Sequence, residues 1–334
     1  MLGGLYTDIA FIVTGSIIIW ISSAYVTKSL KRLGAILGIS SFVISFVLMS
    51  FATTLPELIV GINSAVNDAP QLSLGNVVGT NIVNLALILG LVAFIAGRIK
   101  LNDYQDFILN RISSVLFVIS PLVLLADGIL SRADGFILIF LFFWSLAHVF
   151  KLKEKLKGKI FHGILITTIK GTIDGIISVV KESINSIAVF VVSVTFLIGS
   201  SFLIVGGAES LSIKLGLSEI FIGMFIIGIG TSLPELVFGV RSAMKKQGDM
   251  SLGNLFGASV INATLVLGIT AVISPITISD SLTFWIGVAF MLITIFTAYA
   301  MLRTKNFLVR KEGLILIIIY VIFFIIQSSV CSIC

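Results

Sequence analysis

Long apolar segments alternate with short polar ones along almost the whole of the 334-residue chain. Most of the apolar segments are around 20 residues long, the length that an α-helix needs to cross the hydrocarbon core of a bilayer. Membrane β-barrels instead show alternating segments of about ten residues. The pattern therefore predicts ten transmembrane helices, at about residues 6–30, 38–66, 72–96, 107–126, 134–151, 186–213, 217–243, 251–273, 282–302 and 312–328.

The composition supports a membrane protein. Hydrophobic residues make up 57% of the chain and charged residues only 11%, whereas an average soluble domain is about 25% charged. So few charged side chains cannot cover the surface of a soluble protein of this size. We therefore expect an all-α polytopic membrane protein.

Basic residues indicate how the spans are oriented. If the N-terminus is placed outside and the loops are assigned alternately, all of the 22 lysines and arginines except Arg132 and Lys214 fall on the inner side. Cytoplasmic loops are enriched in these residues. We therefore expect an inner (cytoplasmic) membrane protein with cytoplasmic basic loops and both termini external. The net charge of +6 then reflects topology, and the expected partners are inorganic cations and the bilayer, not nucleic acid. The oligomeric state stays open, and a monomer is compatible with the sequence.

The segment 152–185 differs from the spans on either side of it. It carries most of the basic run KLKEKLKGK and then mixes apolar residues with charged ones, such as Lys170 and Asp174, at helical spacing. This pattern is typical of an amphipathic helix that lies on the membrane face. We interpret the segment as a cytoplasmic linker, with a regulatory role as the alternative. It joins a first unit at 1–151 to a second unit at 186–334.

The two units are duplicates. A shift of 178 positions carries Thr53, Pro56 and Glu57 onto Thr231, Pro234 and Glu235, and carries SLGNVVGTNIVN onto SLGNLFGASVIN. The shift is constant and needs no gap. Each unit contains five predicted spans, and five is odd, so the second unit enters the membrane from the opposite side. The prediction is two inverted five-helix repeats, related by a pseudo-two-fold axis in the membrane plane, as in many secondary transporters.

Each repeat carries a glutamate directly after a proline within an apolar span. A charged side chain at the bilayer centre costs roughly 2.5–3.5 kcal/mol, so Glu57 and Glu235 are expected to have a function. We expect Pro56 and Pro234 to break their helices and to leave carbonyls unpaired. Such carbonyls are tolerated at membrane depth where they line a cavity or meet a partner such as a cation.

These residues supply only oxygen ligands. Calcium takes 6–8 oxygens in flexible geometry, and the absence of His and Cys near both motifs argues against zinc or copper. The sequence thus predicts one divalent cation between two carboxylates, with protons as competitors. The predicted site residues are Glu57 and Glu235, the carbonyls near Thr53 and Thr231, the hydroxyls of Thr54, Ser232 and Thr80, and the amides of Asn84 and Asn262.

The motifs TTLPE and GTSLPE, followed by GNVVGTNIVN and GNLFGASVIN, resemble the two alpha-repeats of the cation/calcium exchanger superfamily, and its prokaryotic sodium/calcium exchangers most of all. The resemblance covers the ten-span layout. It implies that Glu57 and Glu235 are the main calcium ligands and that the first and sixth spans slide to alternate access. It also implies carbonyl ligands from Thr53 and Thr231, sodium sites at Thr54, Thr80 and Ser232, and a central position for Asn84.

Two positions depart from that family pattern. Asn262 stands where the family usually has Asp, and Ala258 stands where it usually has Ser. The first motif also begins FATT instead of the usual Gly-Thr-Ser. These changes weaken the case for coupling to three sodium ions, and two glutamates suit exchange of calcium for protons equally well. The prediction is a secondary-active calcium/cation antiporter without a cofactor, with Na⁺/Ca²⁺ exchange first and H⁺/Ca²⁺ exchange as the alternative.

Two other classes of function are weaker alternatives. A cation channel would use the same polar residues, and an intramembrane hydrolase would use the glutamates as an acid/base pair. No nucleophile–base arrangement accompanies them, because His148 and His162 lie far along the sequence from both motifs. The chain is therefore expected not to be an enzyme. The C-terminal CSIC pair, Cys331 and Cys334, has no second pair to complete a metal site, and we interpret it as incidental.

Overall fold

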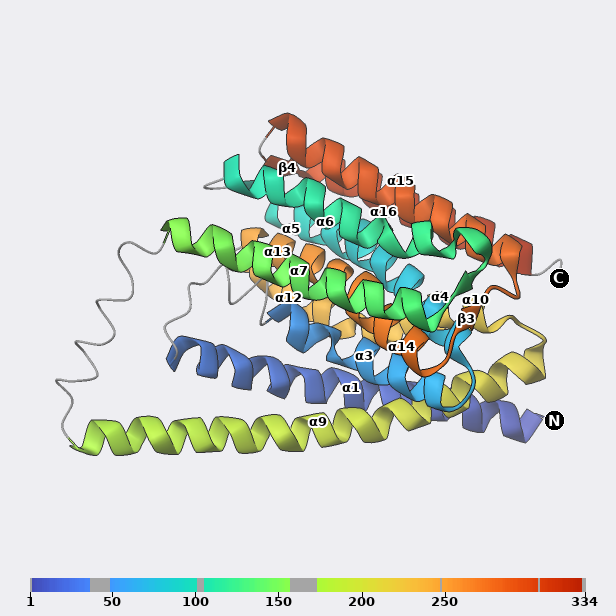
Figure 1. Ribbon diagram of the computed structural model, residues 1–334, viewed down its shortest axis with the longest axis horizontal. Coiled ribbons are helices and arrows are strands. Elements are labelled where there is room, and N and C mark those ends of the chain that lie inside the picture. Colours follow the sequence, from blue (N-terminus) through green and yellow to red (C-terminus); the bar gives the residue numbers. More distant parts are fainter. Residues whose placement is uncertain are drawn as a thin grey trace.

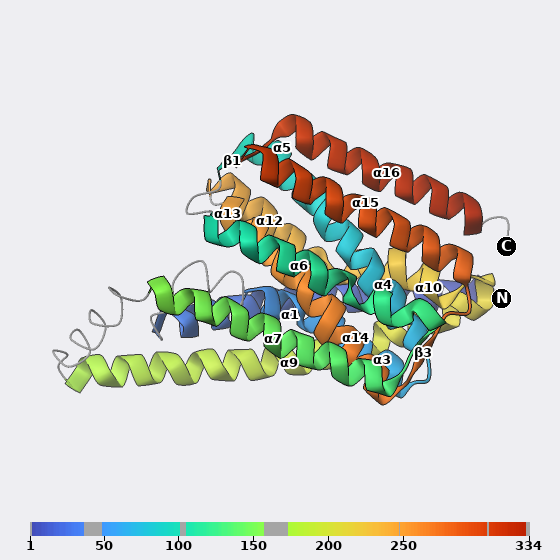
Figure 2. The same ribbon diagram turned by 45° about the horizontal axis from the view of Figure 1, so that its top comes forward.

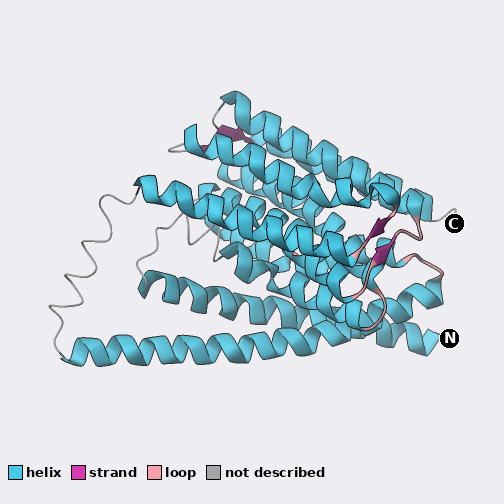
Figure 3. Ribbon diagram, viewed as in Figure 1, coloured by secondary structure: helices cyan, strands magenta, loops and turns pink. Residues whose placement is uncertain are grey.

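The computed structural model describes residues 2–36, 49–100, 105–156, 173–246, 248–305 and 307–331. The described chain is almost entirely helical, and its helices lie side by side in an elongated bundle (Figures 1 and 3). The start of α1 and the end of α16 lie at the same end of the bundle in both views (Figures 1 and 2).

Helices occupy all ten predicted segments, as far as these segments are described. The first half contains α1 (Leu2–Ile36), α3 (Ser50–Val66), α4 (Pro70–Ile82), the π-helix η2 (Val83–Ile88), α5 (Leu89–Ala96), β1 (Arg98–Lys100), α6 (Gln105–Leu124), the 3₁₀-helix η3 (Leu125–Asp127), β2 (Ile129–Leu130) and α7 (Arg132–Leu156). The second half contains α9 (Ile173–Leu215), α10 (Glu219–Ile222), the π-helix η5 (Gly223–Ile227), α11 (Gly228–Thr231), α12 (Leu233–Met244), α13 (Gly248–Ile261), the π-helix η6 (Asn262–Val266), α14 (Leu267–Ile273), β3 (Ile276–Thr277), α15 (Ser281–Lys305), β4 (Phe307–Val309) and α16 (Arg310–Cys331).

Six helical stretches of the described chain are long and apolar enough to cross a membrane, and a seventh is added if the bent pair Glu219–Thr231 and Leu233–Met244 counts as one span. The count is lower than the predicted ten. One reason is that α3 begins at Ser50, and most of the N-terminal part of its predicted span lies outside the described residues. Two further predicted spans, which coincide with α6 and α7, are also missing from this count. The six stretches are Leu5–Val26, Pro70–Ala96, Ile184–Leu215, Met250–Ile273, Ser281–Leu302 and Arg310–Val330.

Helix α9 is one continuous helix of 43 residues, about 65 Å long at 1.5 Å per residue. Figure 1 shows its first turns extending beyond the neighbouring helices. Residues 173–185, predicted as part of the linker, therefore run into the span without a break. The sequence there has no proline to end the helix. Residues 157–172, the rest of that segment with His162, lie outside the described residues, as does Cys334.

The shift of 178 positions also relates the observed elements. It carries α3 onto α11 and α12, α4 onto α13, η2 onto η6 and α5 onto α14. It carries β1 onto β3 and β2 onto β4. Strand β1 pairs antiparallel with β4, with Ile99 opposite Leu308, and β2 pairs antiparallel with β3, with Leu130 opposite Ile276. Each half thus contributes one strand to each of two small sheets, which lie at opposite ends of the bundle (Figure 3).

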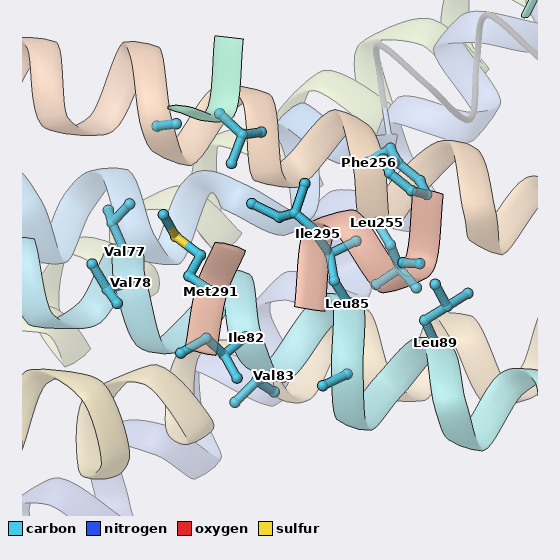
Figure 4. Packing of buried hydrophobic residues seen from close by; sticks show 14 of the residues in the cluster. Val77, Val78, Ile82, Val83, Leu85, Leu89, Leu255, Phe256, Met291 and Ile295 are labelled. Carbon is cyan, nitrogen blue, oxygen red and sulfur yellow. The ribbon is translucent and has the colours of Figure 1, made fainter. Parts of the chain in front are cut away.

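The buried core lies around the middle helices of both halves. Figure 4 shows Val77 and Val78 of α4 beside Met291 of α15, and Leu255 of α13 near Ile295. All five side chains are almost fully buried. The middle helices of the two halves therefore share one apolar core.

Helices α1 and α9 form an outer pair that packs along its length (Figure 1). An added Cβ at Gly15 would lie 2.6 Å from the Ile204 side chain, so the contact is close. At one end, Lys214 forms an ion pair with the buried Asp8 at 2.6 Å. The outward face of the pair carries large exposed apolar side chains, including Tyr6, Phe11, Trp20, Phe196 and Phe202. Such a face suits contact with lipid.

Candidate ion-binding site

The two glutamates come together from different halves of the chain. Glu57 is on α3 and Glu235 is on α12, and neither side chain has any solvent-exposed surface. The carboxyl of Glu57 is close enough to that of Glu235 for the two charges to interact. This is the juxtaposition that the repeated Pro-Glu motif predicts.

The described residues satisfy neither carboxylate. All four carboxylate oxygens lack a hydrogen-bond donor among the described residues, and the ion pair between Asp8 and Lys214 involves neither glutamate. A buried, uncompensated carboxylate is strongly unfavourable. The pair therefore needs a cation or a proton from outside the chain.

The prolines act differently in the two halves. Pro56 lies inside α3, which runs unbroken through it, so the expectation of a break there is wrong. At Pro234 the helix does break: α11 ends at Thr231, and the pair of helices bends by 44°. Glycine is the weakest helix former after proline. The second half has Gly228 and Gly230 where the first half has Ser50 and Ala52. These glycines weaken the helix before Pro234, so the helix ends there, whereas α3 continues through the equivalent Pro56.

The predicted hydroxyls keep their protons within their own helices. Thr54 donates to the Ser50 carbonyl at 2.6 Å, and Ser232 donates to the Gly228 carbonyl at 2.7 Å. These two bonds are equivalent under the shift of 178 positions. Thr80 donates to the amide oxygen of Asn76 at 3.2 Å. The oxygen lone pairs of all three hydroxyls remain available to a cation.

Asn84 and Asn262 lie at π-helical segments. Asn84 is in η2, and Asn262 is the first residue of η6. Both side chains are completely buried, and neither the oxygen nor the nitrogen of either amide has a partner among the described residues. π-Helical turns occur frequently at functional sites. Sequence patterns do not reveal these segments.

Glycines bring α4 against the helix that carries the second motif. An added Cβ at Gly75 would lie 2.2 Å from the Ile220 carbonyl oxygen, and one at Gly79 would lie 2.1 Å from that of Met224. These two glycines therefore permit a close approach of the helices. It holds α4 beside α11, and so places Asn76 against Thr231.

Two buried asparagines that contact the motif threonines are absent from the predicted set. The Asn76 amide oxygen accepts the Thr231 hydroxyl at 3.2 Å, and the Asn254 amide oxygen accepts the Thr53 hydroxyl at 3.3 Å. Ser50 also donates to the Asn254 carbonyl at 3.2 Å. Their equivalent positions in the duplicated SLGN motif are the sequence feature that could have identified these asparagines.

The described chain has no cluster of three or more His, Cys, Asp or Glu side chains that could hold a metal ion. A cation between Glu57 and Glu235 would therefore have to complete its coordination with neutral oxygens. Carbonyls, hydroxyls and amides of the two motifs are the available groups. This mixture of ligands suits a hard cation.

Comparison with known proteins agrees with this geometry. The model of the sodium/calcium exchanger protein family matches residues 7–151 and, a second time, residues 185–329. The chain belongs to the sodium/calcium exchanger family. The same shift of 178 positions relates the two matches, so this family's model, too, finds the duplication.

Several known proteins resemble the chain over most of its length. Inner membrane protein YrbG of Escherichia coli is 28% identical, and the match covers 80% of both chains. Sodium/calcium exchanger MaX1 of Methanosarcina acetivorans is 27% identical over 91% of this chain and 93% of its own. The fold matches that of the sodium-calcium exchanger NCX_Mj soaked with Na⁺ and Sr²⁺, with a TM-score of 0.67 at 24% identity, over 95% of this chain and 97% of that one. The chain is thus a membrane transporter of this family.

Proposed function

We propose that the chain is a secondary-active calcium antiporter that binds one Ca²⁺ between Glu57 and Glu235. The observation that carries this proposal is the meeting of two fully buried carboxylates, one from each half, with no donor on any of their four oxygens. Their two charges match one divalent cation. Membership of the sodium/calcium exchanger family supports the same substrate.

The remaining ligands are neutral oxygens of both motifs. The missing N–H groups of Pro56 and Pro234 leave the carbonyls of Ala52 and Gly230 without their helical donors. Thr53 and Thr231 contribute carbonyls one position further on. The other proposed ligands are the hydroxyls of Thr54, Ser232 and Thr80 and the buried amides of Asn84 and Asn262.

The ten predicted spans form two inverted repeats, with both termini external and the basic loops cytoplasmic. Three observations support this arrangement: the constant shift between the halves, the reciprocal pairing of β1 with β4 and of β2 with β3, and the termini at one end of the bundle. Sliding of α1 and α9 along the rest of the bundle would open the site alternately to each side.

The carboxylate pair explains why transport is an exchange. An empty site would leave two uncompensated charges in an apolar interior, which is strongly unfavourable. Calcium therefore leaves when other cations replace it. Sodium is the proposed counter-ion, because the hydroxyls of Thr54, Thr80 and Ser232 add ligands around the pair. Protons on the same two carboxylates are the alternative, which Asn262 and Ala258 favour by supplying no charge and no hydroxyl.

Flux measurements test this function. We expect proteoliposomes that contain the purified chain to take up radioactive calcium when an outward sodium gradient is imposed, and to do so in a saturable manner. Uptake driven only by an outward proton gradient would assign H⁺ as the counter-ion. Uptake with neither gradient would indicate a channel, and no uptake under any gradient would reject calcium transport.

A further inference from the structure

Asn76 and Asn254 connect the two halves next to the glutamate pair. Asn76, on α4 of the first half, accepts the hydroxyl of Thr231 from the second half, and Asn254, on α13, accepts that of Thr53 from the first half. Both asparagines are completely buried. The two bonds are equivalent under the shift of 178 positions, so the same contact is made twice.

Each of these threonine hydroxyls has a second acceptor nearby. The Thr231 hydroxyl lies beside the Glu57 carboxyl, and the Thr53 hydroxyl lies beside the Glu235 carboxyl. A hydroxyl carries only one proton to donate. In this structure each hydroxyl lies within hydrogen-bonding distance of an asparagine oxygen, at 3.2 and 3.3 Å, and none of the four carboxylate oxygens accepts a hydrogen bond from the described residues.

The direction of these protons decides what the site can bind. A hydroxyl that donated to a carboxylate would form a charge-assisted hydrogen bond, and a cation would have to displace it. While the asparagines hold the protons, the hydroxyl lone pairs and the carboxylate oxygens are all acceptors. An environment of oxygen acceptors is what a hard cation binds.

We propose that Asn76 and Asn254 are positioning residues for the transported cation. By accepting the hydroxyl protons of Thr231 and Thr53, they keep Glu57 and Glu235 free of donors from within the protein. They contact neither the carboxylates by a hydrogen bond nor, by this assignment, the ion itself. The inference rests on the proposed cation site between the glutamates.

The two asparagine oxygens accept hydrogen bonds from different numbers of side-chain hydroxyls. The Asn76 oxygen also accepts the Thr80 hydroxyl at 3.2 Å, whereas the position equivalent to Thr80 is Ala258. Asn254 therefore holds one side-chain hydroxyl and Asn76 holds two. The Thr53 hydroxyl also has the Ser50 carbonyl at 3.4 Å as an alternative acceptor. Loss of the Asn76 oxygen is thus expected to weaken cation binding more than loss of the Asn254 oxygen.

A double-mutant cycle on Asn254 and Thr53 tests the proposal, with initial rates of radioactive calcium uptake by proteoliposomes of the full chain. Asn254→Leu removes the acceptor at similar size. A net hydrogen bond is worth about 1 kcal/mol, so we expect the calcium KM to rise about fivefold, with the maximal rate little changed. Asn254→Asp keeps an accepting oxygen, and we expect no rise in KM. Thr53→Val keeps the carbonyl but removes the hydroxyl, and in that background Asn254→Leu is expected to change KM less than about twofold.

The control is Asn81→Ala. Asn81 is also a buried asparagine of α4, but its amide nitrogen donates to the Met291 sulfur at 3.9 Å, away from the motif threonines. We expect its calcium KM to match that of the unmodified chain.

An equal rise in KM from Asn254→Leu with and without the Thr53 hydroxyl would mean a general structural role, and no rise at all would also overturn the proposal. If Asn254→Leu does not yield folded protein, Asn254→Ser takes its place with the same expectations, because its shorter side chain cannot reach the Thr53 hydroxyl. Failure of the unmodified chain to carry calcium would instead reject the proposed function, which separates the two results.

Discussion

At the scale of residues, the site is a group of buried polar side chains that lack hydrogen-bond partners among the described residues. Glu57 and Glu235 are buried with no donor on any oxygen, and the amides of Asn84 and Asn262 have no partner among the described residues. Groups of this kind are rare in protein interiors because each costs free energy. Four of them in equivalent positions of two halves indicate that something from outside the chain satisfies them.

A second pair of equivalent positions shows how hydroxyls are satisfied when no ion is involved. Beside Gly61, the hydroxyls of Ser73 and Thr270 form a hydrogen bond at 3.0 Å. The equivalent hydroxyl of Ser251, beside Gly239, has no partner in the described part of the chain, because Val92 stands where the shift places the counterpart of Thr270. The duplication therefore left one buried hydroxyl without its acceptor.

We expect Val92→Thr to supply the missing partner. Its hydroxyl can donate within its own helix, as Thr270 does to Val266 at 2.9 Å, and can accept the Ser251 proton. The free energy of unfolding should rise by about 1 kcal/mol, measured as a higher melting temperature of the detergent-solubilised chain. The reverse change, Thr270→Val, should lower it by a similar amount. A lower melting temperature for Val92→Thr would show that Ser251 is satisfied in another way.

Single residues also show what a sequence can and cannot predict. Glu57 and Glu235 stand out because charges in apolar spans are rare, and their pairing follows from the duplication. Asn76 and Asn254 do not stand out, because an asparagine in a motif full of polar residues does not reveal which hydroxyl it accepts. That depends on the contact between α4 and α11, which is set by the packing of distant segments.

At the scale of elements, the close contact between α4 and the helix α10–η5–α11 positions the site. Gly75 and Gly79 of α4 meet the carbonyls of Ile220 and Met224, and Gly223 meets the Leu72 carbonyl, where an added Cβ would lie 2.4 Å from the oxygen. Both helices therefore contribute glycine to one interface. Any added methyl group would separate Asn76 from Thr231.

We expect Gly75→Ala and Gly79→Ala each to destabilise the protein by about 3 kcal/mol or to prevent folding, because the clash is with backbone atoms that cannot move aside. The yield of monodisperse protein and its melting temperature measure this. Gly206→Ala on α9 is the matched control, since a Cβ there meets nothing within 4 Å, and it should be neutral. Normal folding and calcium uptake by Gly79→Ala would contradict the proposed role of this contact.

Elements were predicted well where hydrophobic length determines them and less well where backbone details do. All ten segments contain helix as far as they are described. The continuity of α3 through Pro56, the unbroken start of α9 at Ile173 and the π-helical turns η2, η5 and η6 were not predicted. Each depends on how a helix is supported by its neighbours, which composition and periodicity do not contain.

At the scale of the whole molecule, the two halves are interlocked. Strands from both halves form each small sheet, Asn76 and Asn254 reach across to the opposite half, and Gly90 of α5 meets Gly313 of α16 as Gly268 of α14 meets Gly135 of α7. These last two contacts are also equivalent under the shift. The duplication could be predicted from the sequence, but the reciprocal contacts could not, because they depend on how the halves dock. Reciprocity of this kind is what a pseudo-two-fold axis would produce, as in the proposed inverted repeat.

In the proposed site, cation binding is a property of both halves together. Neither carboxylate alone carries enough charge for one Ca²⁺, so the site should exist only when Glu57 and Glu235 are both present. Equilibrium binding of radioactive calcium to the purified, detergent-solubilised chain measures this most directly. We predict one Ca²⁺ per chain for the unmodified protein and for the control Glu219→Gln, which lies at the start of α10, and no binding for either Glu57→Gln or Glu235→Gln. Retention of calcium binding by either of the latter two variants would contradict a shared site.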